Sequence, residues 1–142
     1  MTSEDILTRA ALVLLAACGV ESTGAPITAE GPPTWPAQVA EAAQLWNDAT
    51  RAECLTFAPD GLPVRLYAEW PGEANERGYY DGLEIAVRET RDDVERATLV
   101  HELGHYLGLP HSDDPTSVMW PIVGGRYIPT TRDAQDAAVL CN

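Results

Sequence analysis

Apolar residues recur at helical intervals in the segment 35–50, whose sequence is WPAQVAEAAQLWNDAT. Intervals of four, three and four residues place one stripe of side chains on the buried face of an amphipathic helix. Pro36 suits the first helical position, where a missing backbone N–H costs nothing. We therefore expect a first helix over this segment. The residues of the buried stripe are Val39, Ala43, Trp46 and Thr50.

Two further segments have a helical pattern. We expect a second helix over residues 92–108, with Gly108 placed to end it in a left-handed conformation. A third helix is expected over residues 130–140, with Thr131 as its N-cap and with alanine and leucine on its apolar face.

Between the first two helices the pattern changes from helical to alternating. Residues 62–70 and 82–89 each alternate apolar with polar side chains, as half-buried strands do. The segment between them, PGEANERGYYDG, is rich in turn residues and is expected to form a loop. The order helix, strands, helix, irregular segment, helix predicts an α+β domain with a small sheet.

The first 34 residues have a different pattern. The run AALVLLAAC ends at Cys18 and is too short to span a bilayer; it resembles a secretory signal, and LAAC resembles the lipobox of bacterial lipoproteins. We expect a lipoprotein-type signal peptide over residues 1–17, a lipidated Cys18 with a flexible tether over 18–34, and one domain over 35–142. The acidic start departs from the usual basic one, and an ordinary apolar helix with a buried cysteine is the alternative.

Composition narrows the classes of partner. The 142 residues are 45% hydrophobic and 22% charged, which suits one globular domain. The formal net charge of −13 argues against nucleic acid as a partner, because phosphate binding requires an excess of lysine and arginine. The expected protein is a monomer that is tethered to the bacterial cell envelope, at the outer membrane or cell surface, or is secreted.

All three histidines of the chain lie in one short stretch, HELGHYLGLPH. His101 and His105 are four residues apart, so both imidazoles leave the same face of the predicted second helix. His111 can reach the same point only if the helix ends and the chain turns back. Gly108 permits such a turn, and Pro110 prevents the helix from resuming.

Three neutral imidazoles can hold one zinc ion and leave its fourth position for water, which is the arrangement of a catalytic zinc site. Zinc lowers the pKa of that water to ~7, and Glu102, next to the first ligand, suits the general base. A structural zinc site would more often be closed by a fourth protein ligand. Ordinary surface or core histidines are the alternative, and the further specified positions after His105 argue against it.

The histidine stretch resembles the H-E-x-x-H-x-x-G-x-x-H pattern of metzincin peptidases, and the residues after it resemble the matrixin branch of that group. Ser112 follows the third histidine, as in matrixins. The segment DPTSVMWP resembles the matrixin Met-turn, with Met119 as its methionine. The resemblance is dense over residues 98–121 and thin over residues 35–97.

This resemblance implies a zincin-like metzincin fold, with a small twisted mixed sheet, three helices and zinc in the cleft. It also implies a metalloendopeptidase that cuts proteins or peptides. By the same analogy, the strand 82–89 is the edge strand that pairs with an extended substrate. Pro121, Ile122 and Tyr127 would line the pocket for the substrate side chain just after the cut. For Tyr127, a packed loop aromatic is an equally good interpretation.

Cys54 and Cys141 are the two cysteines that remain if Cys18 is lipidated. In an oxidising compartment such a pair predicts one disulfide. Cys54 lies just after the first helix, and Cys141 lies at the end of the last. The resemblance to matrixins implies an arrangement in which these two helix ends lie close together. Two reduced, buried cysteines are the alternative and would fit a cytosolic protein better.

Three functions remain open from the sequence. The first is a zinc endopeptidase tethered by lipid to an envelope surface. The second is a dedicated processing enzyme with one partner protein. The third is a catalytically silent surface lipoprotein that uses the fold to bind proteins. The intact Glu102 and the three intact histidines argue against the third.

Overall fold

The computed structural model describes residues 24–141, so the predicted signal peptide over 1–17 and the predicted lipidation site at Cys18 lie outside the described residues. Within 24–141 no helix has the length and apolar character needed to cross a membrane. The strands are β1 (Ala25–Glu30), β2 (Leu55–Phe57), β3 (Leu62–Tyr67), β4 (Gly78–Tyr80) and β5 (Ile85–Arg88). The helices are α2 (Trp35–Thr50), α3 (Asp92–Leu107) and α4 (Thr131–Cys141).

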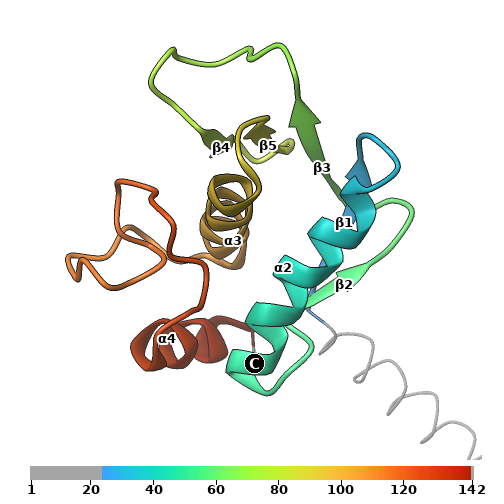
Figure 1. Ribbon diagram of the computed structural model, residues 1–142. Helices are drawn as coiled ribbons and strands as arrows, with labels where there is room; N and C mark the ends of the chain where they lie inside the picture. The colour runs from blue at the N-terminus through green and yellow to red at the C-terminus, as the bar shows by residue number, and fades with distance from the viewer. Residues whose placement is uncertain (1–23, 142) are drawn as a thin grey trace, which may run out of the picture.

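The strands form one mixed sheet in the order β2-β1-β3-β5-β4. The first four strands in that order are parallel to their neighbours, and β4 joins antiparallel at the edge. Helices α2 and α3 pack on one face of the sheet, and α4 lies across their end beside α2 (Figure 1). For the described residues, this confirms the α+β class, the small mixed sheet and the three helices.

Two buried tryptophans on α2 connect the layers of the core. The indole nitrogen of Trp35 donates to the Val64 carbonyl oxygen on β3 at 2.8 Å. The indole nitrogen of Trp46 donates to the Val100 carbonyl oxygen on α3 at 2.9 Å. Each ring therefore buries a large apolar surface and still satisfies its polar atom. These contacts fix α3, which carries two of the histidines, against α2.

The prediction of a flexible tether over 18–34 is wrong for its C-terminal part, because β1 lies there. β1 is an inner strand that pairs with β2 on one side and with β3 on the other. Its sequence, APITAE, places Ala25, Ile27 and Ala29 on the core side, but only Ile27 has a large apolar side chain, so the alternation is weak. The strand forms because two neighbours satisfy its backbone groups. The folded domain consequently begins before residue 35.

The predicted role of the strand 82–89 as the edge strand is also wrong. β5, which occupies part of that segment, lies between β3 and β4. The strand at this edge of the sheet is β4, and it lies inside the segment 71–82 that the sequence predicts as a loop. Its three residues follow a run of turn-forming residues, and a strand this short has too few positions to show an alternating pattern.

The helices begin and end close to the expected residues. Gly108 ends α3 in the left-handed conformation, with φ of 109°, as predicted. The N-cap of α4 is one residue earlier than expected, because the Thr130 hydroxyl, rather than that of Thr131, accepts a hydrogen bond from the Asp133 N–H at 3.1 Å. The Asp133 carboxylate accepts from the Thr130 N–H at 3.0 Å in return. This reciprocal pair is a capping box.

The structure contains the disulfide between Cys54 and Cys141, whose Cα atoms are 5.4 Å apart. Cys54 is buried and directly precedes β2, and Cys141 ends α4. The bridge therefore ties the last helix to the start of the β2 strand, on the side of the sheet far from β4.

Candidate metal centre

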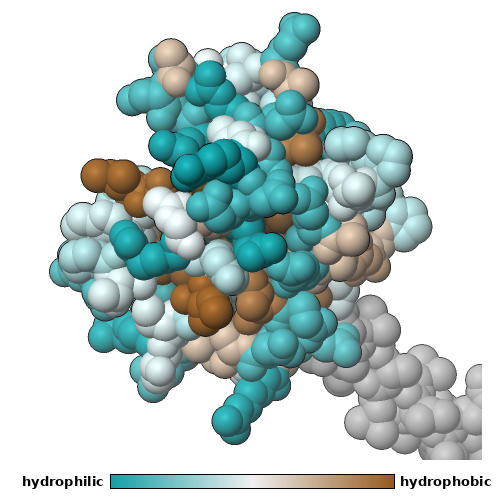
Figure 2. Space-filling view, in the orientation of Figure 1, coloured by the Kyte–Doolittle hydropathy of each residue, from teal (hydrophilic) through white to brown (hydrophobic). Residues whose placement is uncertain are grey.

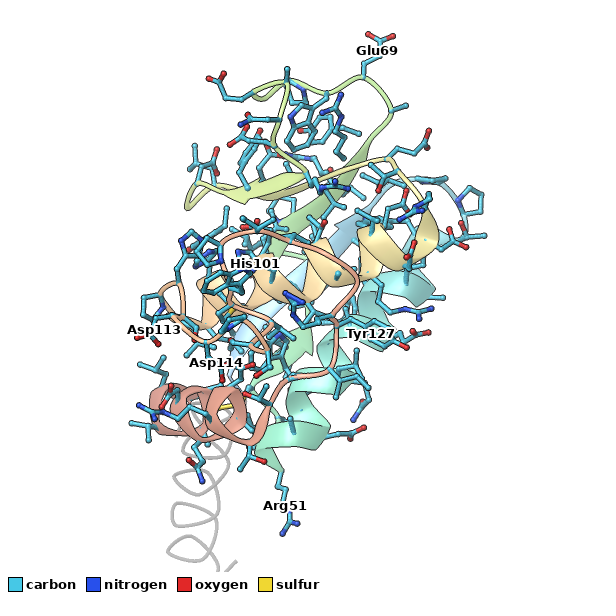
Figure 3. All side chains as sticks on the ribbon, turned by 60° about the vertical axis from the view of Figure 1, so that its left-hand side comes forward. Arg51, Glu69, His101, Asp113, Asp114 and Tyr127 are labelled. Atoms are coloured by element: carbon cyan, nitrogen blue, oxygen red, sulfur yellow. A yellow bond between two sulfur atoms is a disulfide. The ribbon has the colours of Figure 1, made fainter. Side chains whose placement is uncertain are left out.

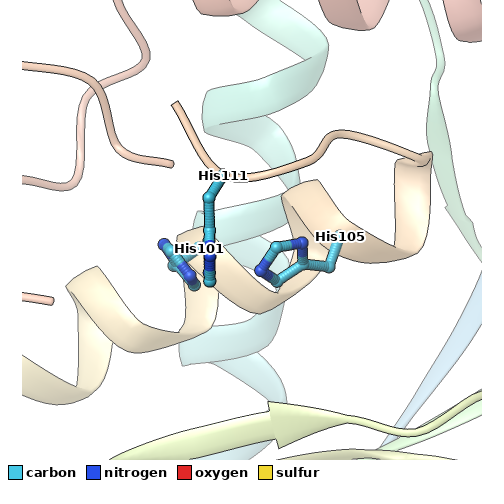
Figure 4. Close-up of side chains that lie close together, drawn as sticks. All are labelled: His101, His105 and His111. Carbon is cyan, nitrogen blue, oxygen red and sulfur yellow. The ribbon is translucent and has the colours of Figure 1, made fainter. Parts of the chain in front are cut away.

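The three histidines converge although they come from two segments (Figure 4). His101 and His105 leave one face of α3. After Gly108 the chain reverses and returns His111 over the same face, because the left-handed Gly108 lets the Leu109 N–H bond back to the Gly104 carbonyl oxygen at 2.9 Å. One ligand atom from each ring lies within 4.8 Å of the other two, so the rings can hold one metal ion.

Hydrogen bonds fix the orientation of two of these rings. Nδ1 of His101 is 2.7 Å from the Val118 carbonyl oxygen, and Nδ1 of His105 is 2.8 Å from the Leu109 carbonyl oxygen. A carbonyl oxygen only accepts, so each Nδ1 carries the proton and each Nε2 keeps a free lone pair. This is the tautomer of metal-ligating histidines, whose second nitrogen is typically held by such a partner. The donor set therefore fits a zinc ion.

The surroundings of His101 and His105 favour the neutral form of both rings. Burial lowers the pKa of His101 to about 4 and outweighs the hydrogen bond to Val118. Burial also lowers the pKa of His105. Neutral imidazoles are the form that binds metal, because a protonated ring has no free lone pair.

Glu102 follows the first histidine and is 6% exposed. Burial raises the pKa of its carboxyl to about 8, and the negative charge of Glu76 adds to the shift. A divalent cation beside the carboxyl would act in the opposite direction and favour the carboxylate. A bound metal ion would therefore lower the pKa of Glu102 and favour its ionised form.

A cleft of about 610 Å³ opens over the histidines. One wall is the edge strand β4 with the residues before it, and the other is the segment after Met119. On the face shown in Figure 2, hydrophilic side chains predominate and hydrophobic surface is confined to small areas. The residues that line the cleft are Asn75, Glu76, Arg77, Gly78, Tyr79, Tyr80, His101, Glu102, His105, His111, Pro121, Ile122 and Val123.

The turn at Met119 packs beneath the histidines. Met119 is buried, and its side chain lies against Gly104 of α3 so closely that a Cβ at Gly104 would overlap its sulfur. The same Cβ would lie 3.0 Å from the Trp46 ring. Gly104, between the two helical histidines, is therefore the residue that lets α3, α2 and this turn meet.

Comparison with known proteins agrees with this geometry. The matrixin family model matches residues 42–138. The chain belongs to the matrixin family. It is 63% identical to the matrilysin of Felis catus over 68 residues, which are 48% of this chain and 26% of that protein. It is 34% identical to the macrophage metalloelastase of Oryctolagus cuniculus over 64 residues, which are 45% of this chain and 14% of that protein.

The matrixin chain thus spans about a quarter or less of the curated relatives that it matches. A solved structure of myroilysin is similar in fold, with a TM-score of 0.62 and 16% identity. That match covers 84% of this chain and 92% of the myroilysin chain. The similarity confirms the zincin-like metzincin architecture that the histidine motif predicted.

The structure brings most of the predicted site residues together. Pro121 and Ile122 line the cleft beside the histidines, and Ile122 is 73% exposed there. Tyr127 is not among the lining residues of the described cleft. The guanidinium of Arg96 lies over the Tyr127 ring, 4.7 Å from its centroid. In Figure 3, Tyr127 lies to one side of His101. The interpretation as a packed loop aromatic fits this position.

Sequence reasoning missed Asp133, a buried carboxylate on α4 that is 4% exposed. It accepts hydrogen bonds from the Ser117 hydroxyl and, at 3.1 Å, from the Val118 N–H. The carbonyl of the same Val118 holds the His101 ring. Asp133 therefore supports a candidate ligand through one intervening residue. The Thr-x-x-Asp capping signature at 130–133 was the available signal.

Proposed function

We propose that this matrixin is a zinc-dependent endopeptidase. The observation that carries the proposal is the convergence of His101, His105 and His111 beside Glu102, in a cleft bordered by the edge strand β4. The family and the names of its relatives support a metalloprotease. A zinc ion bound to the three rings would supply a Lewis acid that activates water near neutral pH and polarises a peptide carbonyl.

The proposed role of Glu102 is to move one proton. Its carboxylate takes the proton from the attacking water and passes it to the amine that leaves when the peptide C–N bond breaks. The hydrogen bonds at Nδ1 of His101 and His105 hold the rings in one orientation during this step. Such support limits the reorganisation that the site needs during reaction.

The proposed substrate is an extended peptide that adds to the sheet. β4 pairs with β5 on one side and lines the cleft, so a peptide in the cleft can hydrogen-bond to its other side. The pairing edge is β4 rather than the strand 82–89. Pro121 and Ile122, across the cleft, are proposed to contact the side chain just after the cut.

We also propose that the protein is exported and tethered by lipid at Cys18. The LAAC sequence after an apolar run supports this, and the disulfide of the folded domain is of a kind that persists in oxidising compartments. Mass spectrometry of the native N-terminus tests it, with a diacylated Cys18 as the expected result. A protein from the cytosolic fraction with an unmodified Met1 would contradict it.

The experiment for the catalytic proposal uses the zinc-loaded chain and a library of internally quenched peptides. We expect Glu102→Gln to retain one zinc per chain and to lose roughly 10²–10⁴-fold in kcat, the usual contribution of a general base. The matched control is Glu95→Gln, because Glu95 is also buried on α3 but caps the Thr90 N–H instead of lining the cleft. Wild-type turnover by Glu102→Gln would contradict the mechanism. Stoichiometric zinc without turnover by the wild type would instead favour a binding protein.

A further inference from the structure

The loop between β3 and β4 folds against the outer face of the sheet, which is the face opposite α2 and α3. Trp70 in this loop packs on two tyrosines of that face, with ring centroids 6.2 Å from Tyr67 and 5.5 Å from Tyr79. Its indole nitrogen donates to the Glu73 carbonyl oxygen at 3.0 Å. Figure 1 shows this loop arching beyond the sheet from β3 to β4, and Glu69 lies at its far end in Figure 3.

Arg88 on β5 holds the second half of this loop. Ile85 and Val87 face the core, and the pleat therefore directs the Arg88 side chain to the outer face. One guanidinium nitrogen, Nη1, donates to the Ala74 carbonyl oxygen at 2.7 Å and to the Glu76 carbonyl oxygen at 3.2 Å. The Arg88 backbone N–H donates to the Arg77 carbonyl oxygen at 2.8 Å. One residue thus bonds three of the four residues that precede β4.

Those residues form part of the cleft wall. Asn75, Glu76 and Arg77 line the cleft, and Gly78 follows them directly. Gly78 lies against α3, since a Cβ added there would be 3.4 Å from Cγ of Glu102. The position of the wall beside Glu102 therefore depends on backbone atoms that Arg88 holds from the opposite face of the sheet.

We propose that Arg88 is a positioning residue for substrate binding, because it fixes residues 74–77 and thereby sets the position of the β4 wall of the cleft. The inference rests on the proposed peptidase function. A planar guanidinium with several donors can bond two carbonyl oxygens at once, whereas a lysine ammonium is a point charge without this fixed geometry. Arg88 does not reach the metal site itself, so its loss should weaken peptide binding more than the chemical step.

A second arginine on the same face provides the matched control. Arg65 on β3 bonds the carboxylates of Glu30 and Glu84, at 3.0 and 3.2 Å. Neither of these contacts is to residues 74–77, and Glu84 meets β4 only at the Tyr79 hydroxyl. Arg65→Met therefore removes the same charge and a similar number of hydrogen bonds, and leaves the bonds between Arg88 and residues 74–77 in place.

The experiment compares zinc-loaded wild type with Arg88→Met, Arg88→Lys and Arg65→Met. For Arg88→Met we expect KM for a long peptide to rise about tenfold, because peptide binding must then also order the freed wall, with kcat changed less than about twofold. Arg88→Lys should recover part of the loss. Arg65→Met should keep the wild-type KM, and the zinc content should be equal in all four proteins.

Hydrogen exchange provides a readout that does not need turnover. In Arg88→Met, amides of residues 73–80 should exchange faster than in wild type, while the amides of α3 keep their protection. Unchanged exchange in this segment would overturn the inference, even if peptidase activity is never found. Faster exchange with an unchanged KM would overturn the positioning role. A fall in kcat at constant KM would also overturn the positioning role, because Arg88 would then affect the chemical step rather than peptide binding.

Discussion

The two walls of the cleft are held by different kinds of contact. The helical wall, which comprises α3 and residues 117–123, is fixed by buried side chains such as Met119 and by the buried carboxylate of Asp133. None of the residues of the strand wall, residues 75–80, is buried, and its supports are the half-buried Arg88 and an aromatic cluster on the outer face. Buried contacts suit metal ligands, which need one geometry. Surface hydrogen bonds suit a wall that, in the proposed function, adjusts to a bound peptide.

The largest effect on the helical wall should follow loss of the disulfide that fixes the end of α4. The bridge closes a loop between residues 87 positions apart, and its removal in a Cys54→Ala, Cys141→Ala double variant should lower the free energy of unfolding by about 2–5 kcal/mol. Urea unfolding without reductant measures this. Wild type under reducing conditions should match the variant, and a change below about 1 kcal/mol would show that α4 holds its place without the bridge.

Removal of Asp133 should be the next largest effect. Asp133→Ala leaves the Ser117 hydroxyl and the Val118 N–H without their buried acceptor, which should cost about 3 kcal/mol of stability. Zinc affinity should fall about 10–100-fold, because Val118 orients His101. Zinc competition with a chelator and urea unfolding measure the two effects. Asp136→Ala on the exposed side of α4 is the control and should change both little.

Gly78→Ala tests the point where the two walls meet. The added Cβ would be 2.5 Å from Cγ2 of Thr98 and 2.8 Å from the Ala86 carbonyl oxygen, so β4 or α3 must shift at a cost of about 1–3 kcal/mol. Since Glu102 is next to the same position, kcat should fall while zinc content stays constant. Gly124→Ala is the control, because nothing lies within 4 Å of a Cβ there. Equal kcat and KM for the two variants would show that the position of β4 does not affect Glu102.

The smallest effect should be the pH-dependent contribution of Glu84 to the free energy of unfolding. Glu84 lies on the outer face of the sheet, behind the strand wall. Burial raises the pKa of Glu84, but hydrogen bonds from Tyr67, Tyr79 and Arg65 outweigh it and leave the pKa below its usual value of 4.5. A lowered pKa contributes stability that is present above pH 4.5 and is lost as the pH falls through the lower folded-state value.

Glu84→Gln should therefore be less stable than wild type at pH 7 by less than about 1 kcal/mol, and the difference should shrink below pH 4. Urea midpoints of both proteins at several pH values measure this. A difference that grows on acidification would contradict the assignment of the shift to these hydrogen bonds.

Local signals in the sequence were sufficient to predict α2 and α3. The apolar stripe of α2, the two histidines four residues apart and Gly108 each act within one or two helical turns, so the chain itself shows where α2 and α3 begin and end. The site residues on α3 and the return of His111 followed from the same spacing. The cap of α4 at Thr130 was one residue from the prediction, because both threonines are suitable N-caps.

The strand wall and its supports were decided by tertiary structure. β1 is a strand because neighbours distant in sequence satisfy its backbone groups, and its alternation is too weak to predict this. β4 pairs with the nearby β5, but its three residues are too few to show a pattern. Likewise, no local rule connects Arg88 to Ala74, or Asp133 to Val118. A helix satisfies its hydrogen bonds within itself, so sequence determines it locally. A strand and a buried carboxylate depend on partners that only the folded chain brings within reach.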